Sequence, residues 1–501
     1  MYTIGYDIGS SSIKAALFDC VNGNALYKST FPKTEMSIDA KATGWAEQEP
    51  QTWWNAVVLA TKEILANSKV NASDISAVGI SYQMHGLVVV DKNHKVLRPS
   101  IIWCDSRAVE IGDDAYDSLG HEYCLQRLLN SPGNFTASKL KWVKENEPGV
   151  FNEVHKFMLP GDFIAMKLTG DITTTVNGLS EGILWDFSKN STADFLLKYY
   201  GFGDDLLPKI VPVFGEQGEL TNEAASELGL KPGTKVTYRT GDQPNNAFSL
   251  NVLNPGEIAG TAGTSGVIYG ISDSIKYDPE TRVNTFAHVN HSSEHGRFGI
   301  LLCINGTGIS YSWIKKLLGN SSLSYDDMNE MASKVSIGSE GLNFLNFGNG
   351  AERMLGNKNP GAFFSNINFN IHSKEYMIRA VVEGVAFSFK YGIDILESLD
   401  MKPAAINAGN ANMFLSPIFR ETLASLTGVP INLYDTDGAV GAARGAAVGA
   451  GIFKSFSEAF SGLKKIETIE PDKKNLTKYN SAYYNWLDEL NLQLNKKEQA
   501  L

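Results

Sequence analysis

A strand–turn–strand pattern occurs twice in this chain of 501 residues, once at the N-terminus and once in the second half. The first copy reads GYDIGSSSIKAALFD and the second AGTAGTSGVIYGIS. Each has glycines and small hydroxylated residues between two apolar arms, which is typical of a β-hairpin. The recurrence predicts a duplicated domain. Two such hairpins that face each other across a cleft could hold a chain of phosphates on backbone N–H groups and hydroxyls, while glycine and serine that merely form turns are the alternative.

The segments around the hairpins predict further strands and helices. TWWNAVVLATKEILANS follows Pro50 and has apolar residues at three- and four-residue spacing, which predicts a helix near 50–67. ISAVGISYQ reads as a buried strand, and the region 106–201 as helix-rich. GAVGAARGAAVGAGIF contains Arg444 and too many glycines for a membrane span, so it predicts a tightly packed helix. Residues 471–501 predict a docked helix with a frayed end.

Composition and charge narrow the class of protein. The 55 acidic and 44 basic side chains give a formal charge of −11, which argues against a nucleic-acid partner because such partners require a basic surface. The four cysteines form no CxxC pair, so we expect buried free thiols rather than disulfides or a zinc site. The first residues run directly into a strand pattern without a charged leader, which predicts a cytoplasmic protein with no membrane partner.

Two aspartates are the candidates for acid–base and metal chemistry. Asp242, in TYRTGDQPNNAF, follows an apolar strand at the predicted domain junction, in a Gly-Asp-Gln-Pro turn. A carboxylate there could take a proton from a substrate hydroxyl, although aspartate also caps turns and helices. Asp7 lies beside the first hairpin tip, where it could hold Mg²⁺ through water, and an ordinary turn aspartate is the alternative.

Neutral polar and apolar residues near a strand end suit a sugar. His85 and Gln83, in SYQMHG, offer donors and acceptors for hydroxyl groups, and Met84 and Trp103 could cover the C–H face of a sugar. His85, Met84 and Trp103 are more often core residues, which is the alternative. AGNAN precedes a helix pattern and could take an adenine edge or a phosphate. The Walker A pattern and the HRD and DFG motifs of protein kinases are missing, so any phosphoryl transfer belongs to another ATP-binding class.

The order DIGSSSIK, QMHG, WCDSRA, GDQPNNA, GTAGTSG, AGNAN and DGAVGAARGAAVGAG resembles the FGGY family of carbohydrate kinases over essentially the whole chain. The resemblance implies an α/β protein of two RNase H-like domains of the actin/Hsp70 type, residues 1–241 and 242–501. Each domain would hold a mixed sheet flanked by helices, with a cleft between the two. ATP, Mg²⁺ and a small-molecule sugar are the implied ligands, and a homodimer is left open.

The resemblance also assigns roles to individual residues. Asp242 would be the proton acceptor and Asp7 the acid linked to Mg²⁺. The sugar contacts would be Met84, His85, Gln243 and Trp103, and the nucleotide contacts would be Ser10, Ser11, Ser12, Gly263, Thr264, Ser265, Gly409 and Asn410. This chain has AGNANMFLS where many members have GGGAKS, a departure that affects Asn410 and Asn412, and it has Ser138 where members usually have proline.

QMHG is similar to the sugar-contacting motif of the members that phosphorylate xylulose. The resemblance therefore implies ATP-dependent phosphorylation of D-xylulose at its 5-hydroxyl. Two alternatives stay open: a kinase of this family for another sugar or polyol, such as ribulose, fuculose, gluconate or glycerol, and a catalytically silent protein of the same fold that binds sugar or nucleotide.

Overall fold

A computed structural model describes residues 1–318 and 323–498 of the chain. These residues form two compact units. Unit 1 comprises Met1–Asn251, Thr285–Phe298 and Thr436–Leu463, and unit 2 comprises Val252–Asn284, Gly299–Asp435 and Lys464–Leu501. The chain thus passes between the units several times, whereas the sequence predicts a single boundary between residues 241 and 242. The sequence could not indicate this exchange, because it depends on where the segment 436–463 packs.

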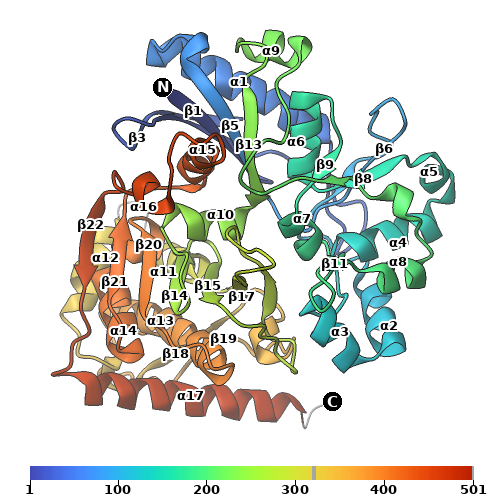
Figure 1. Cartoon of the computed structure of the whole chain (residues 1–501). Helices are drawn as coiled ribbons and strands as arrows, with labels where there is room; N and C mark the ends of the chain where they lie inside the picture. Colours follow the sequence, from blue (N-terminus) through green and yellow to red (C-terminus); the bar gives the residue numbers. More distant parts are fainter. Residues whose placement is uncertain (319–322, 499–501) are drawn as a thin grey trace. The chain divides into compact units, whose positions relative to one another are not determined.

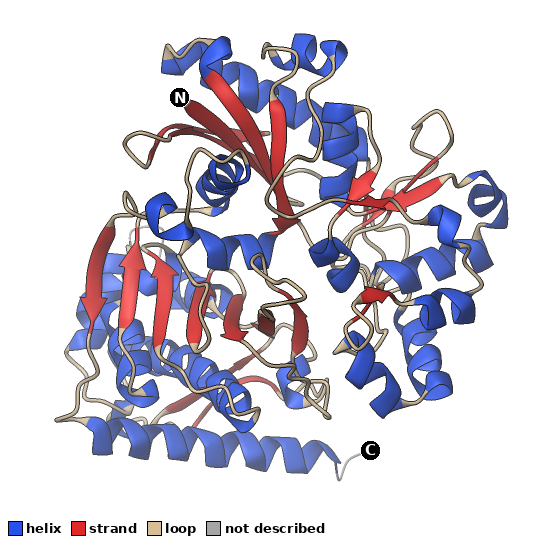
Figure 2. Ribbon diagram, in the orientation of Figure 1, coloured by secondary structure: helices blue, strands red, loops and turns tan. Residues whose placement is uncertain are grey.

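The main sheet of unit 1 has the strand order β13-β5-β1-β2-β3 (Figures 1 and 2). Strands β1 and β2 form the predicted N-terminal hairpin, while β5 pairs in parallel with both β1 and β13. The carboxyl ends of β1, β5 and β13 therefore meet at one edge of the sheet. The strands are β1 (Tyr2–Ile8), β2 (Ile13–Asp19), β3 (Asn24–Phe31), β5 (Ile75–Tyr82) and β13 (Lys235–Gly241).

Helices cover both faces of this sheet. The side chains of Ile4, Tyr6 and Ile8 pack in one core with Trp53 of α1 (Pro50–Ser68), which confirms the helix predicted after Pro50. The opposite face meets α15 (Gly438–Gly449), where Thr3 Oγ1 donates to the carbonyl oxygen of Ala443. The other helices of unit 1 are α2 (Val109–Leu119), α3 (His121–Leu128), α4 (Thr136–Asn146), α5 (Pro148–Glu153), α6 (Pro160–Thr169), α7 (Val176–Glu181), α8 (Asp194–Tyr200), α9 (Asn222–Leu228), α10 (Asp242–Ser249) and α16 (Phe456–Ala459).

The glycines of β1 and β5 let α15 approach the sheet backbone. A Cβ on Gly5 would lie 2.1 Å from the carbonyl oxygen of Ala439, and a Cβ on Gly79 would lie 2.1 Å from that of Ala442. Such distances are far below van der Waals contact, so these positions accept only glycine. The prediction of a tightly packed helix is confirmed, and Arg444 within it is buried with its Nε donating to the carbonyl oxygen of Ala459.

Unit 2 repeats the strand arrangement of unit 1. Strands β14 (Glu257–Ala262) and β15 (Gly266–Ser272) form the second predicted hairpin, and β14, β20 (Ala405–Gly409) and β21 (Ile431–Tyr434) pair in parallel. The order β17-β15-β14-β20-β21 matches β3-β2-β1-β5-β13, with β17 (Phe298–Ile304) in the place of β3. This shared order confirms the predicted duplication. On the far side of β21 lies β22 (Lys465–Ile469), and β18 (Asn343–Phe347) pairs with β19 (Gly361–Ser365) in a separate ribbon.

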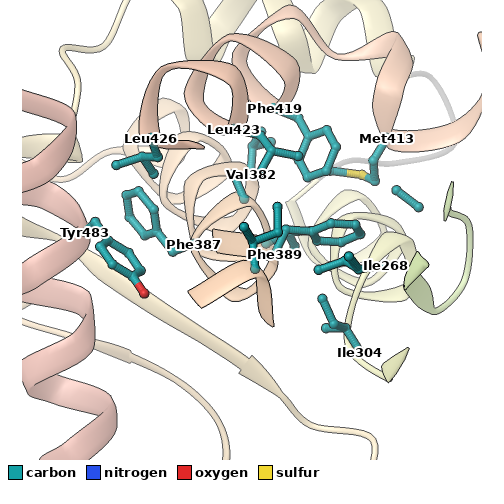
Figure 3. Close-up of a cluster of buried hydrophobic side chains, with 14 of the residues drawn as sticks. Ile268, Ile304, Val382, Phe387, Phe389, Met413, Phe419, Leu423, Leu426 and Tyr483 are labelled. Carbon is teal, nitrogen blue, oxygen red and sulfur yellow. The ribbon is translucent and has the colours of Figure 1, made fainter. Parts of the chain in front are cut away.

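The core of unit 2 lies between its sheet and its long helices. Phe389 of α13 (Lys374–Ser398) packs edge-on against Phe419 of α14 (Pro417–Thr427), with ring centroids 5.4 Å apart, near Ile268 of β15 (Figure 3). The C-terminal helix α17 (Leu476–Glu498) buries one stripe on this core, which confirms the predicted docked helix. The stripe consists of Tyr479, Ala482, Tyr483, Trp486 and Leu490. The end of the predicted frayed segment lies outside the described residues.

The cysteines only partly follow the prediction. All four are free thiols, as expected, and Cys20 and Cys124 are buried. The prediction is wrong for Cys104 and Cys303, which are exposed. Cys303 occupies an outward position within the otherwise buried strand β17, and Cys104 follows Trp103 in an irregular segment. Within residues 1–318 and 323–498, no helix is both long and apolar enough to span a membrane.

Candidate active site

Asp7 lies near the carboxyl end of β1, within the sheet edge of unit 1. Its Oδ1 accepts a hydrogen bond of 3.0 Å from the hydroxyl of Ser81, its neighbour on β5. Burial raises the pKa of the Asp7 carboxyl, opposed by the charge of Lys14 and the Ser81 hydrogen bond, and the charge of Asp437 raises it further. A Cβ on Gly438 would lie 2.7 Å from Asp7 Oδ2, so the carboxylate faces the first turn of α15. A helix N-terminus at this position favours negative charge.

Asp242 follows β13 directly and is the first residue of α10. The Gly-Asp-Gln-Pro segment, predicted as a turn, is therefore the start of a helix, because Pro244 fits the first turn where no N–H partner is needed. Desolvation raises the pKa of Asp242 to about 7, and the charge of Asp7 contributes to this rise. Hydrogen bonds from Gln243 lower it. The two candidate aspartates thus interact at one edge of the sheet, because Ile8 and Gly241 both pair with Tyr82.

His85 follows β5 at the same edge. Its backbone is in the left-handed region, with φ 61°. The ring Nδ1 lies 2.9 Å from the carbonyl oxygen of Glu181, and a carbonyl only accepts, so Nδ1 carries a proton and donates. The ring packs edge-on against Phe135 at 4.7 Å and tilted against Phe286 at 5.3 Å. Met84, the preceding residue, is buried.

Gln243 follows Asp242 on α10, and the other sequence-predicted residues of unit 1 lie around the first hairpin tip. Trp103 is about half exposed, at 52%, and its Nε1 donates to the Ser10 hydroxyl over 3.3 Å. The backbone N–H of Gly9 donates to the carbonyl oxygen of Ser12, which closes the tip. Ser11 is exposed and Ser12 half-buried. The structure therefore brings a residue of the WCDSRA segment against a serine of the first hairpin tip.

Unit 2 contains a pocket of about 500 Å³ beside the second hairpin. Gly263 and Thr264 of the hairpin line it together with Asn412, while Ser265 is exposed and Gly409 and Asn410 are not among its lining residues. Gly409 ends β20, and the Asn410 N–H donates to the carbonyl oxygen of Tyr434. The structure thus favours Asn412 over Asn410 as the residue of the AGNAN segment that faces this pocket.

Sequence reasoning missed the other wall of this pocket. Helix α11 (Gly308–Leu318) begins against the hairpin, where the N–H groups of Gly308 and Ile309 donate to the carbonyl oxygens of Gly263 and Thr264. Asn329, on α12 (Tyr325–Ser333), accepts hydrogen bonds on Oδ1 from two further lining residues, the hydroxyls of Tyr311 and Ser416. No motif singles these residues out, because they come together only in the folded unit.

Glu181 is a second residue that the sequence did not reveal. Among the residues that the structure describes, neither of its buried carboxylate oxygens finds a hydrogen-bond partner. Burial holds the pKa of Glu181 well above its usual range, and the charge of Asp242 raises it further. The hydroxyl of Tyr82 acts in the opposite direction and lowers this pKa. A Cβ on Gly241 would lie 2.9 Å from Glu181 Oε2. The side chain therefore lies against the backbone that carries Asp242.

Comparison with known proteins places this geometry in a family. Residues 2–249 match the model of the N-terminal domain of the FGGY family of carbohydrate kinases, and residues 258–452 match that of its C-terminal domain. The chain belongs to the FGGY family of carbohydrate kinases. It is therefore a phosphotransferase of carbohydrate metabolism that binds ATP, and the FGGY fold of two α/β domains of the actin/Hsp70 type agrees with the two repeated sheets.

Relatives of this FGGY kinase extend over its whole length. A xylulose kinase from Lactococcus lactis is 29% identical over 97% of this chain and 95% of its own. Among solved structures, a xylulose kinase from Rhodospirillum rubrum has a TM-score of 0.89 at 24% identity, over 99% of both chains. A gluconate kinase from Lactobacillus acidophilus has the same TM-score of 0.89 at 23% identity, over 98% of both chains. The fold is thus shared by kinases that are named for different substrates.

Proposed function

We propose that this enzyme transfers the γ-phosphoryl group of ATP to the 5-hydroxyl of D-xylulose, giving D-xylulose 5-phosphate and ADP. The observation that carries the phosphoryl-transfer chemistry is the pair Asp7 and Asp242 at one sheet edge, with Asp242 desolvated beside the loop that holds His85. The choice of sugar rests on the QMHG segment and on the full-length similarity to the Lactococcus lactis protein.

Asp242 acts as the general base in this proposal. A base with a pKa near the working pH is effective because enough of it is unprotonated and it still binds the proton firmly. The pKa of about 7 meets this condition. The sugar oxygen attacks the γ-phosphorus as its proton passes to Asp242, the new P–O bond forms, and the bond to the bridging oxygen of ADP breaks. Most of the acceleration comes from positioning and charge neutralisation, with the base supplying the smaller share.

His85, Met84, Gln243 and Trp103 hold the sugar. Because Nδ1 of His85 donates to the Glu181 carbonyl, Nε2 is the ring atom that can accept a hydrogen bond from a sugar hydroxyl. Met84 offers an apolar surface for C–H groups.

Two kinds of contact serve the nucleotide. The tip residues Ser10 to Ser12 and Gly263 to Ser265 offer N–H and hydroxyl groups to phosphate oxygens. The pocket of about 500 Å³ in unit 2 suits the adenosine part, with Asn412 on its wall and with Gly409 and Asn410 at the start of the same segment.

Asp7 fits a role with Mg²⁺ carried by ATP. Within the described residues, no group of three or more histidine, cysteine or acidic side chains is arranged to hold a metal alone. Mg²⁺ in kinases needs only one or two carboxylates, because phosphate oxygens and water complete its shell. Asp7 beside Asp242 supplies that negative charge. When bound, the ion would neutralise charge on the phosphates.

The test is a coupled ADP-release assay with MgATP across D-xylulose, L-ribulose, D-ribulose, L-fuculose, gluconate and glycerol. We expect the highest kcat/KM for D-xylulose, with a 5-phosphate product identified by ³¹P NMR. A preference for another sugar would keep the chemistry and overturn the substrate. ADP release with none of them, from folded protein that binds ATP, would favour the silent binding protein instead.

A further inference from the structure

Lys139, on α4, is fully buried and contacts two loops that carry proposed sugar-binding residues. Its Nζ donates hydrogen bonds of 2.9 Å to the carbonyl oxygens of His85 and Ile102. His85 belongs to the loop after β5, and Ile102 directly precedes Trp103. One ammonium group therefore joins the backbone of the two loops.

Burying this lysine costs free energy, since lysine is almost never fully buried unless its charge is compensated. Burial lowers the pKa of Lys139 to about 7, and the charge of Asp105 opposes that shift. Cys104 also raises the pKa of Lys139, whereas the charge of Arg107 lowers it. The two carbonyl oxygens offset part of the cost of burying the ammonium group. They also show where Lys139 acts, which is on the backbone of the two loops.

His85 has a conformation that needs such support. Its φ of 61° lies in the left-handed region, which residues other than glycine occupy at a cost. Strained conformations of this kind persist where the surroundings determine them from several sides. Here Glu181 holds the ring through Nδ1, Phe135 packs against the ring, and Lys139 holds the backbone carbonyl.

We propose that Lys139 is a positioning residue of the sugar site, which fixes the backbone of His85 and of the segment before Trp103 so that both side chains are set for the sugar. This inference rests on the proposed function, because it assumes that these loops bind the substrate. Lys139 itself is too deeply buried to touch the sugar, so its effect passes through the two loops.

The test compares Lys139→Met with Lys144→Met. Methionine keeps the apolar stem and removes the donors. Lys144 is a matched control on the same helix, because its Nζ also donates to two backbone carbonyls, those of Tyr200 and Gly201. These residues lie at the end of α8, which carries none of the proposed sugar contacts. We expect Lys139→Met to raise the KM for D-xylulose about 10- to 100-fold, as expected for the loss of two hydrogen bonds of about 1 kcal/mol each. The KM for ATP should stay within about twofold, and Lys144→Met should change neither constant.

Thermal melting of each variant separates positioning from general stability. A purely structural role would lower kcat through loss of folded enzyme and leave both KM values unchanged, and this result in Lys139→Met would overturn the inference. If Lys139→Met does not fold, Lys139→Gln retains one donor group and should raise the KM for sugar by a smaller factor; an unchanged value there would also overturn it. A wild-type enzyme that phosphorylates no sugar would instead refute the proposed function, and the inference with it.

Discussion

Replacing Asp242 by asparagine should stabilise the folded protein increasingly as the pH rises, while it removes most of the activity. The pKa of an aspartate carboxyl is ordinarily 3.8, whereas that of Asp242 in the folded protein is about 7. A raised pKa means that the folded state binds the proton more tightly than the unfolded state. The stability of the wild type therefore falls as the pH rises between these two values, and the loss is complete above pH 7.

The shift of roughly three pKa units corresponds to about 4 kcal/mol at 1.36 kcal/mol per unit. This is an upper limit, because the side chain is partly exposed and solvent screens its charge. About 2 kcal/mol of it would develop between pH 5 and pH 7, because the carboxyl is still half protonated at pH 7. Asparagine does not titrate, so the stability gap between variant and wild type should widen by up to that amount over this interval.

The assay is thermal or urea unfolding of both proteins at pH 5, 6, 7 and 8. Asp273→Asn, which alters an exposed aspartate outside the site, serves as the control for the loss of one carboxylate. Turnover of Asp242→Asn should fall about 10²- to 10⁴-fold, the usual contribution of a general base. A stability gap that stays constant from pH 5 to pH 8 would refute the reasoning, because Asp242 would then have an ordinary pKa.

Three further substitutions test the other parts of the site. Asp7→Asn removes a charge that raises the pKa of Asp242, so the acid limb of the pH profile of kcat/KM should move to lower pH. If the limb does not move, the charge of Asp7 does not influence the pKa of Asp242. His85→Ala should raise the KM for sugar about tenfold or more and leave the KM for ATP unchanged, and steady-state kinetics against each substrate would reveal the reverse pattern if His85 served the nucleotide. Asn329→Leu removes two hydrogen bonds in the wall of the unit 2 pocket, so the KM for ATP should rise about tenfold with no change for sugar, as measured by ATP titration.

Local patterns in the sequence predict most of the fold. The alternating apolar arms around DIGSSS and GTAGTS predict both hairpins, and Pro50 marks the start of α1. The small residues of GAVGAARGAAVG indicate close packing, although only the structure shows that Ala439 and Ala442 of this helix lie against Gly5 and Gly79 of the sheet. The conformation at Asp242 could not be predicted from local sequence, because Gly-Asp-Gln-Pro is compatible both with an isolated turn and with the first turn of a helix.

Long-range contacts explain what the sequence could not predict. Lys139 reads as the polar side of an amphipathic helix, and its burial depends on carbonyls of His85 and Ile102, which are 54 and 37 positions away. No local sequence pattern marks Glu181, because its position in the site depends on its contact with Gly241, far away in the sequence. The pocket of unit 2 is assembled from the hairpin, α11, α12 and the segment around Asn412, and no single motif spans these parts.

The most direct test of the central claim is ADP formation from MgATP with and without D-xylulose, by the wild type and by Asp242→Asn. The account predicts ADP release that depends on the sugar, matches D-xylulose 5-phosphate mole for mole, and falls at least about 100-fold in the variant. Equal turnover by both proteins, or ADP release by the wild type that does not depend on the sugar, would contradict it.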